Sequence, residues 1–207
     1  MAMMKIVSPS DPRIPLGVAH YYRNAQAYED QKNPGNPLPD FFCKAARQAI
    51  RPTETVFDMG CGAGLAGEML VKAGHRGLRI ANDVSLDMIA HSLAKGYYSE
   101  AYHCNAIRAV EELKLVGGID WAVALSMSGY LDSEDLKELL YRLYETCRRG
   151  VIMSFEALTP EQITASMVPV YPHTYDEVVA TLPKGWKVET MAGVRGIAVL
   201  LCLSRKT

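Results

Sequence analysis

The feature that most constrains the fold is a regular alternation of two sequence patterns between residues 54 and 155. Short apolar runs typical of strands occur at 54–59, 78–83, 101–105, 119–125 and 150–155. Helical patterns fill the intervals, at 65–73, 85–95, 106–115 and 132–147. Strands that alternate with helices at this spacing form a mostly parallel sheet, because a crossover between parallel strands needs a helix-sized connection. We therefore expect an α/β fold, a Rossmann-like doubly wound sheet with helices on both faces.

The C-terminal part of the chain follows a different pattern. A helix is expected at 175–182, and strands are expected at 186–191 and 197–203. The link between these two strands, residues 192–196, is short and contains glycine. Such a link favours a hairpin, so the last two strands should be antiparallel. The whole sheet should then have about seven strands, of which the C-terminal hairpin is the antiparallel part.

The N-terminal part is set apart by a proline-rich stretch. Residues 29–39 carry three prolines and a glycine among polar residues, which predicts a loop. Helices are expected on either side of it, at 20–28 and 40–50, the second with Asp40 as its N-cap.

Length and composition indicate one globular domain with a short accessory segment. We divide the 207 residues into an N-terminal helical lid, 1–52, and a main domain, 53–207. Hydrophobic residues make up 49% of the chain, which excludes a disordered protein. The net charge is −1, so electrostatics give no reason to expect nucleic-acid binding.

The sequence also limits the compartment and the partners. No apolar run is long enough to span a bilayer, and the first residues lack the apolar core of a secretory signal. The five cysteines are scattered and form no CxxC pair, so neither a disulfide framework nor a zinc site is indicated. We expect a reduced, cytoplasmic protein, monomeric or homodimeric, with no metal and no nucleic-acid or membrane partner.

The strongest chemical signal is a glycine cluster, VFDMGCGAGLAGEML, where the first strand of the alternation meets its first helix. Glycines at 60, 62 and 64 let the backbone approach a ligand closely. From Gly62 the string is also G-x-G-x-x-G, and Asp83 follows 21 residues later at the end of the next strand. That spacing fits a dinucleotide site as well, so the glycines alone do not identify the ligand.

Asp58 separates the two interpretations. It lies at the carboxyl end of the first strand, inside the expected ligand crevice. A carboxylate there would oppose a pyrophosphate, by about 4 kcal/mol at ~4 Å and an effective dielectric constant of ~20. It would instead favour the ammonium group of S-adenosylmethionine (SAM), while Asp83 could accept hydrogen bonds from both ribose hydroxyls.

The string D-x-G-x-G-x-G at residues 58–64 resembles motif I of the class I SAM-dependent methyltransferases. Asp83 resembles the acidic residue that ends the second strand of that family, and Met88 resembles its frequent adenine neighbour. The order of elements is similar too, so the resemblance covers roughly residues 53–203. It implies SAM as the cofactor, S-adenosylhomocysteine as the product, and methyl transfer to an O, N, S or C nucleophile of a small molecule.

Two positions depart from the family pattern. Asn105 stands where the family often has an aspartate that accepts from the adenine amino group, and it is equally well a turn residue. Residues 124–128, ALSMS, replace any NPPY-like string, which argues against the branch that methylates adenine or glutamine nitrogen. The expected cofactor residues are Asp58, Gly60, Cys61, Gly62, Gly64, Asp83, Val84, Met88, Asn105, Ala106, Leu125 and Ser126.

Two of these residues have a competing structural role. Asp83 is also placed to cap the helix that starts near Ser85. Cys61 lies at a helix N-terminus, where a thiolate is favoured, but we expect a small residue that packs under the ligand and not a nucleophile.

The acceptor site is less well marked. Residues after the fourth and fifth strands of the alternation should face the crevice, because ligands of open α/β sheets bind at the carboxyl ends of the strands. The N-terminal tyrosines either belong to a lid over the ligand or pack as an aromatic stripe on the domain. The catalytic candidates are Tyr21, Glu156 and His173, and the substrate-binding candidates are Tyr22, Tyr28, Ser128 and Tyr130.

Three functional hypotheses follow. The first is a SAM-dependent methyltransferase acting on a small molecule. The second is an NAD(P)-dependent oxidoreductase that uses the G-x-G-x-x-G string and Asp83. The third is a SAM-binding protein or enzyme that transfers no methyl group, which the sequence allows because its cofactor motif is clearer than any acceptor site.

Overall fold

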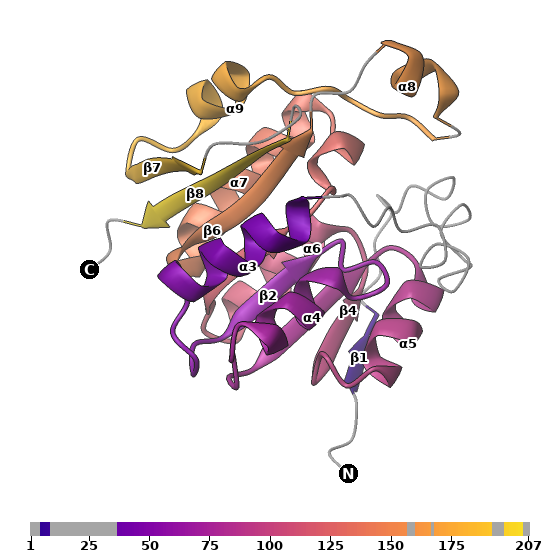
Figure 1. Cartoon of the computed structure of the whole chain (residues 1–207), viewed down its shortest axis with the longest axis vertical. Helices are drawn as coiled ribbons and strands as arrows, with labels where there is room; N and C mark the ends of the chain where they lie inside the picture. The colour runs from indigo at the N-terminus through magenta and orange to yellow at the C-terminus, as the bar shows by residue number, and fades with distance from the viewer. Residues whose placement is uncertain (1–4, 9–36, 157–159, 167, 192–196, 205–207) are drawn as a thin grey trace.

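The computed structural model describes residues 5–8, 37–156, 160–166, 168–191 and 197–204. Its strands are β1 (Lys5–Val7), β2 (Val56–Met59), β3 (Arg79–Asp83), β4 (Glu100–His103), β5 (Ile119–Ala124), β6 (Cys147–Glu156), β7 (Trp186–Met191) and β8 (Ile197–Ser204). Its helices are α3 (Leu38–Ala49), α4 (Leu65–Lys72), α5 (Leu86–Ala94), α6 (Ala106–Leu115), α7 (Ser133–Thr146), α8 (Pro160–Ala165) and α9 (Tyr175–Thr181), with a 3₁₀ turn, η1, at Ser128–Tyr130. Figure 1 shows the helices wrapped around one twisted sheet.

The eight strands form a single sheet in the order β1-β4-β3-β2-β5-β6-β8-β7. The first six in this order are parallel, whereas β8 is antiparallel to both β6 and β7. The predicted doubly wound sheet and its antiparallel C-terminal hairpin are therefore confirmed. The hairpin link, residues 192–196, lies outside the described residues.

Strand β1 was not predicted. It adds an eighth strand by pairing with β4, with Lys5 opposite Glu100. Three residues carry too short a pattern to indicate a strand, so this segment owes its conformation to the free edge of β4. The opposite edge is β7, where Lys187 and Glu189 form an exposed ion pair at 2.7 Å.

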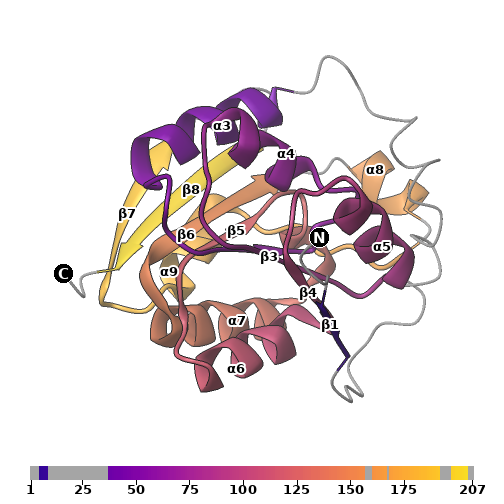
Figure 2. The same ribbon diagram turned by 90° about the horizontal axis from the view of Figure 1, so that it is seen from below.

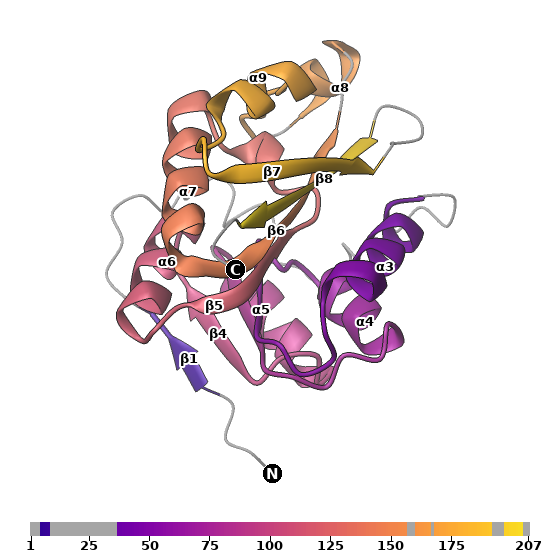
Figure 3. The ribbon, with the colours of Figure 1, turned by 90° about the vertical axis from the view of Figure 1, so that its left-hand side faces the viewer.

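The helices form two layers, one on each face of the sheet, as Figures 2 and 3 show. On one face, α6 and α7 bury a leucine-rich stripe against the sheet, including Leu113, Leu139 and Leu143. On the other face lie α3 and α4, with Phe42 and Leu70 in a second apolar cluster. Both faces are apolar, because the connections of a parallel sheet cover both sides.

Helix α3 begins slightly earlier than expected. Its N-cap is Pro37, and Asp40 lies within the first turn instead of capping it. Leu38, Phe42 and Ala45 are fully buried, so this helix packs as part of the domain. The boundary between a lid and a main domain at residue 53 stays a prediction. The expected helix at 20–28, with Tyr21, Tyr22 and Tyr28, lies outside the described residues.

The parallel strands bring their carboxyl ends to one edge of the sheet. There Asn82 is buried in β3, and its side-chain amide donates to the backbone carbonyls of Tyr102 (3.0 Å) and Cys104 (2.7 Å). This amide therefore fixes the end of β4 beside the end of β3. Among the described helices, none has the length and apolarity that a membrane crossing requires.

Asn82→Ala should lower the free energy of unfolding by about 1–3 kcal/mol, because it removes the side-chain donor to two carbonyls at the sheet edge. Urea denaturation of the purified variant would measure this. Gln48→Ala is the matched control, because it removes an exposed amide from α3 and should change the stability by less than about 0.5 kcal/mol. A loss equally small for Asn82→Ala would show that the amide does not hold the strands together.

Candidate functional site

The glycine loop, residues 60–64, joins β2 to α4 at the carboxyl edge of the sheet. Gly60 and Gly64 have φ angles of +62° and +95°, which L side chains rarely adopt. A Cβ atom at Gly60 would lie 2.5 Å from Met127 Cγ, and one at Gly64 would lie 2.9 Å from Tyr97 Cδ2. Both glycines are thus required by conformation and by close packing against protein side chains.

Asp83 ties the glycine loop to β3. Its Oδ2 accepts from the Gly62 N–H at 2.9 Å, and its Oδ1 accepts from the Ser85 N–H at 2.8 Å. The N-cap of α5 is Ser85, whose side chain accepts from the Met88 N–H. Ser85, and not Asp83, therefore caps α5, which settles the alternative that the sequence left open.

Asp58 lies beneath the loop, 2% exposed. The Tyr98 hydroxyl donates to its Oδ2. Burial, opposed by the Tyr98 hydrogen bond and reinforced by the nearby Asp83, raises the pKa of the Asp58 carboxyl to about 7. Burial also raises the pKa of Asp83, against its backbone hydrogen bonds and the charge of His103. Two carboxylates in so small a space favour a cationic ligand.

Cys61 is a packing residue. It is 5% exposed, and its Sγ lies 3.7 Å from Ser92 Oγ. Burial, together with Asp83 and Asp58, raises the pKa of the thiol well above its usual range. A thiol with such a pKa is a poor nucleophile.

The residues expected around an adenine lie along the next two strand ends. Met88 is 1% exposed and packs on Ala63 of the glycine loop. Asn105 is the N-cap of α6, with its Oδ1 accepting from the Ile107 N–H at 2.8 Å. Ala106 follows it as the first residue of α6, and Val84 follows Asp83. The side-chain oxygen of Asn105 thus accepts a backbone N–H at the start of α6, which is a structural role.

A second group lies after β5. Leu125 is half-buried, and Ser126 is exposed with a φ of +56°, which is unusual for a residue other than glycine. The Ser126 N–H donates to Ser154 Oγ at 2.8 Å, and Ser128 Oγ donates to the Ser154 carbonyl at 3.0 Å. Ser154 of β6 therefore holds the bend after β5. A strained backbone held in this way is a common property of functional sites.

The remaining acceptor candidates are only partly brought together. His173 is half-buried, and its Nε2 lies 2.8 Å from the Leu131 carbonyl, just after η1, which contains Tyr130. The neighbouring Tyr171 N–H donates to the Gly129 carbonyl at 2.7 Å, so this loop lies against η1. Glu156 is the last residue of β6.

Two residues at this edge were missed by the sequence interpretation. Tyr98 contacts Asp58, and His103, at the end of β4, has its Nε2 3.2 Å from the Val84 carbonyl. Neither belongs to a spaced motif, and His103 stood in the middle of the strand predicted at 101–105, which the structure ends at His103. Tyr98 precedes β4 in a loop, where no pattern indicates which way a side chain points.

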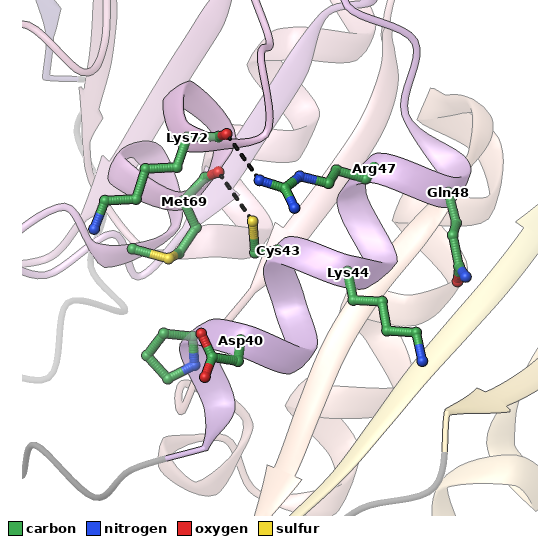
Figure 4. Close-up of a pocket in the computed structure, with 8 residues that line it drawn as sticks. Asp40, Cys43, Lys44, Arg47, Gln48, Met69 and Lys72 are labelled. Atoms are coloured by element: carbon green, nitrogen blue, oxygen red, sulfur yellow. Dashed lines mark hydrogen bonds between the residues drawn. The ribbon is translucent and has the colours of Figure 1, made fainter.

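A separate groove of about 580 Å³ lies between α3 and α4, away from the glycine loop (Figure 4). There Cys43 Sγ lies 3.9 Å from the Met69 carbonyl, and Arg47 donates to the Lys72 carbonyl at 3.2 Å. These bonds hold the two helices together. In the described ranges, no group of three or more His, Cys, Asp or Glu residues is placed to hold a metal ion.

Comparison with known proteins identifies the fold. No family model matches the sequence, and no curated protein is similar to it in sequence. Magnesium protoporphyrin IX methyltransferase from Synechocystis PCC 6803, solved with bound S-adenosylhomocysteine, is similar in structure with a TM-score of 0.68 and 17% identity. That match covers 90% of this chain and 97% of the other.

Two further structures agree. The N-methyltransferase NodS from Bradyrhizobium japonicum WM9, in complex with S-adenosylhomocysteine, matches with a TM-score of 0.66 and 12% identity, over 93% of this chain and 98% of that one. An O-methyltransferase family protein from Burkholderia thailandensis matches with a TM-score of 0.58 and 12% identity, over 81% and 55%. The chain therefore has the Rossmann-like fold of the class I SAM-dependent methyltransferases.

Asp58→Asn should stabilise the protein without ligand at pH 8. The carboxyl pKa is about 7 in the folded state and 3.8 when unperturbed, so the folded state loses stability as the pH rises between these values. Removing the charge should raise the free energy of unfolding by about 2–4 kcal/mol at pH 8, and should change it little at pH 4. Urea denaturation at both pH values measures the difference.

Asp87→Asn is the matched control, because Asp87 is exposed on α5. It should show no comparable gain at either pH. An Asp58→Asn variant that is no more stable than the wild type at pH 8 would contradict the raised pKa.

Proposed function

We propose that this protein is a methyltransferase that moves a methyl group from SAM to a small molecule. The proposal is carried by one observation: two buried carboxylates, Asp58 and Asp83, lie at a glycine loop on the carboxyl edge of the sheet. SAM has a sulfonium, an ammonium and one carboxylate, so it is a net cation when fully charged. Its charge is complementary to such a site.

The loop residues suit the parts of SAM differently. Asp58, beneath the loop, is matched to the amino-acid end through the ammonium group. Asp83 is matched to the ribose, because its carboxylate, which accepts from backbone N–H groups including those of Gly62 and Ser85, has about four lone-pair sites and so has capacity left for a hydroxyl. Met88, in the first turn of α5, and His103, the last residue of β4, are the neighbours for the adenine.

The hydrogen bonds of the loop also argue against a dinucleotide. A pyrophosphate needs backbone N–H groups that point at it, yet the N–H of Gly62 is bonded to Asp83 and that of Gly67 to Tyr98. The two carboxylates would add repulsion of about 4 kcal/mol for each like-charged pair at ~4 Å. The oxidoreductase hypothesis is therefore not favoured.

The acceptor is proposed to be a small molecule bound beside Ser126, Ser128, Tyr130 and His173. The near-zero net charge supports this over nucleic acid. The Synechocystis enzyme, which matches over 97% of its length, is named for a small acceptor, magnesium protoporphyrin IX.

Bound SAM supplies a methyl group activated by a sulfonium, and transfer to an O, N, S or C nucleophile leaves S-adenosylhomocysteine. The chain's own residues hold the two ligands in line and exclude water. Such positioning can supply roughly 7–11 kcal/mol, whereas a general base adds about 3–5 kcal/mol. The residues that fix the ligands therefore matter more than a proton acceptor.

Asp83→Asn should weaken the binding of SAM and S-adenosylhomocysteine tenfold or more, as measured by isothermal titration calorimetry. The amide loses the charge that strengthens hydrogen bonds to the ribose, and such bonds are worth about 1.5–3 kcal/mol. The control is Asp87→Asn, which changes an exposed residue of α5. This variant should bind both ligands with the affinity of the wild type.

The same titrations test the proposed function. Binding of SAM and S-adenosylhomocysteine by the wild type supports it, and binding of NADH without either would overturn it. Methyl transfer itself is tested by following the formation of S-adenosylhomocysteine with candidate acceptors. A protein that binds SAM but yields no product with a proven acceptor ligand would belong to the class that transfers no methyl group.

A further inference from the structure

A single buried hydroxyl connects the two sides of the glycine loop. Tyr98 is 4% exposed, and it precedes β4 in the chain. Its hydroxyl donates to Asp58 Oδ2 at the end of β2 and accepts from the Gly67 N–H of α4 at 2.9 Å. One oxygen atom thus bridges the end of β2 and the first turn of α4.

The third glycine of the G-x-G-x-x-G string makes room for this hydroxyl. A Cβ atom at Gly67 would lie 2.6 Å from Tyr98 Cζ and 2.7 Å from its hydroxyl oxygen. Gly67 is in the first turn of α4, which begins at Leu65, and the N–H groups of a first turn have no acceptor within the helix. Tyr98 supplies that acceptor. Gly67, which completed the dinucleotide-like string, therefore makes room for the Tyr98 side chain and donates its N–H to the Tyr98 hydroxyl.

We propose that Tyr98 is a positioning residue for the amino-acid end of SAM. It engages Oδ2 of Asp58 and so leaves Oδ1 for the ammonium group of the ligand. This inference rests on the proposed function, because it assigns a role within the same cofactor site. It goes beyond the proposed function because a residue outside the glycine motif then determines which oxygen of Asp58 is open to the ligand.

The surroundings of Asp58 make its charge depend on this contact. The titratable groups that face it are Cys61 from the loop, Asp83 from β3 and Tyr98, while His103 acts on Asp83. Burial and Asp83 raise the pKa of Asp58 to about 7, and the Tyr98 hydrogen bond holds it down. Since an ammonium group binds the ionised carboxylate, ligand affinity should rise with pH through this value.

The wild-type protein provides the first test. Between pH 6 and pH 8, the Kd of S-adenosylhomocysteine should fall about tenfold, as expected for a group that titrates near 7. 5′-Methylthioadenosine has the same nucleoside but no amino-acid end, so its Kd should change less than about twofold. Calorimetric titrations of both ligands give the comparison. A Kd for S-adenosylhomocysteine that does not vary with pH would overturn the inference.

Tyr98→Phe provides the second test. The variant should bind S-adenosylhomocysteine about tenfold more weakly at pH 7, and its pH midpoint should move upward because the opposing hydrogen bond is gone. Its affinity for 5′-methylthioadenosine should change little. Tyr102→Phe is the matched control: this buried tyrosine of β4 has its hydroxyl on Glu100 and not on Asp58, so both affinities and the midpoint should be unchanged.

The outcomes separate the two proposals. A wild type that binds neither SAM nor S-adenosylhomocysteine refutes the proposed function. A wild type that binds both, with a Tyr98→Phe variant of unchanged affinity and midpoint, refutes only the role of Tyr98. Equal losses for both ligands with an unmoved midpoint would show that Tyr98 is merely structural. Should the variant fail to fold, as judged by circular dichroism, a Kd of S-adenosylhomocysteine that does not vary with pH in the wild type would still overturn the inference, and a fall that 5′-methylthioadenosine does not share would still support the contact of Asp58 with the amino-acid end.

Discussion

The hydrogen bond from the Gly62 N–H to the Asp83 carboxylate is the contact on which the rest of this site depends. It folds the loop after β2 back over the end of β3, the neighbouring strand. Asn82, one residue earlier, continues the connection to β4 through the carbonyls of Tyr102 and Cys104. Polar side chains thus join three strand ends at the carboxyl edge of the sheet. The loop's shape follows from this edge and not from its glycines alone.

The two ends of the sheet have different energetic characters. At the carboxyl end, Asp58 and Asp83 are buried with raised pKa values, which costs stability whenever both are ionised. At the amino end, Glu54 accepts from Trp121 Nε1 at 2.8 Å and lies 3.4 Å from Arg149 Nε. In this ion pair the Arg149 side chain is 39% exposed and the Glu54 side chain 11%. The buried carboxylates that cost stability therefore lie at one end of the strands. The Glu54 contacts that stabilise the sheet lie at the opposite end.

The sequence predicted most of the architecture, because strands and helices of this length have clear periodicities. The loop glycines and the terminal hairpin follow from local chemistry that a single segment displays. Strand β1 and Tyr98 could not be predicted in the same way. The first depends on an edge formed by residues a hundred positions later, and the second on the direction of a side chain in an irregular loop. For Asn105 the residue type left open an adenine contact and a turn, and the structure shows its side chain at the N-cap of α6.

The two edge strands of the sheet bear on self-association. A sheet can grow by pairing its outer strand with that of a second molecule, and proteins limit this with short or charged edges. Here one edge is β1, only three residues long, and the other is β7, which carries the Lys187–Glu189 ion pair. Neither offers a long, flat, uncharged template for another strand. Association between copies of this chain is therefore expected to use helical faces or loops, and not a continuous intermolecular sheet.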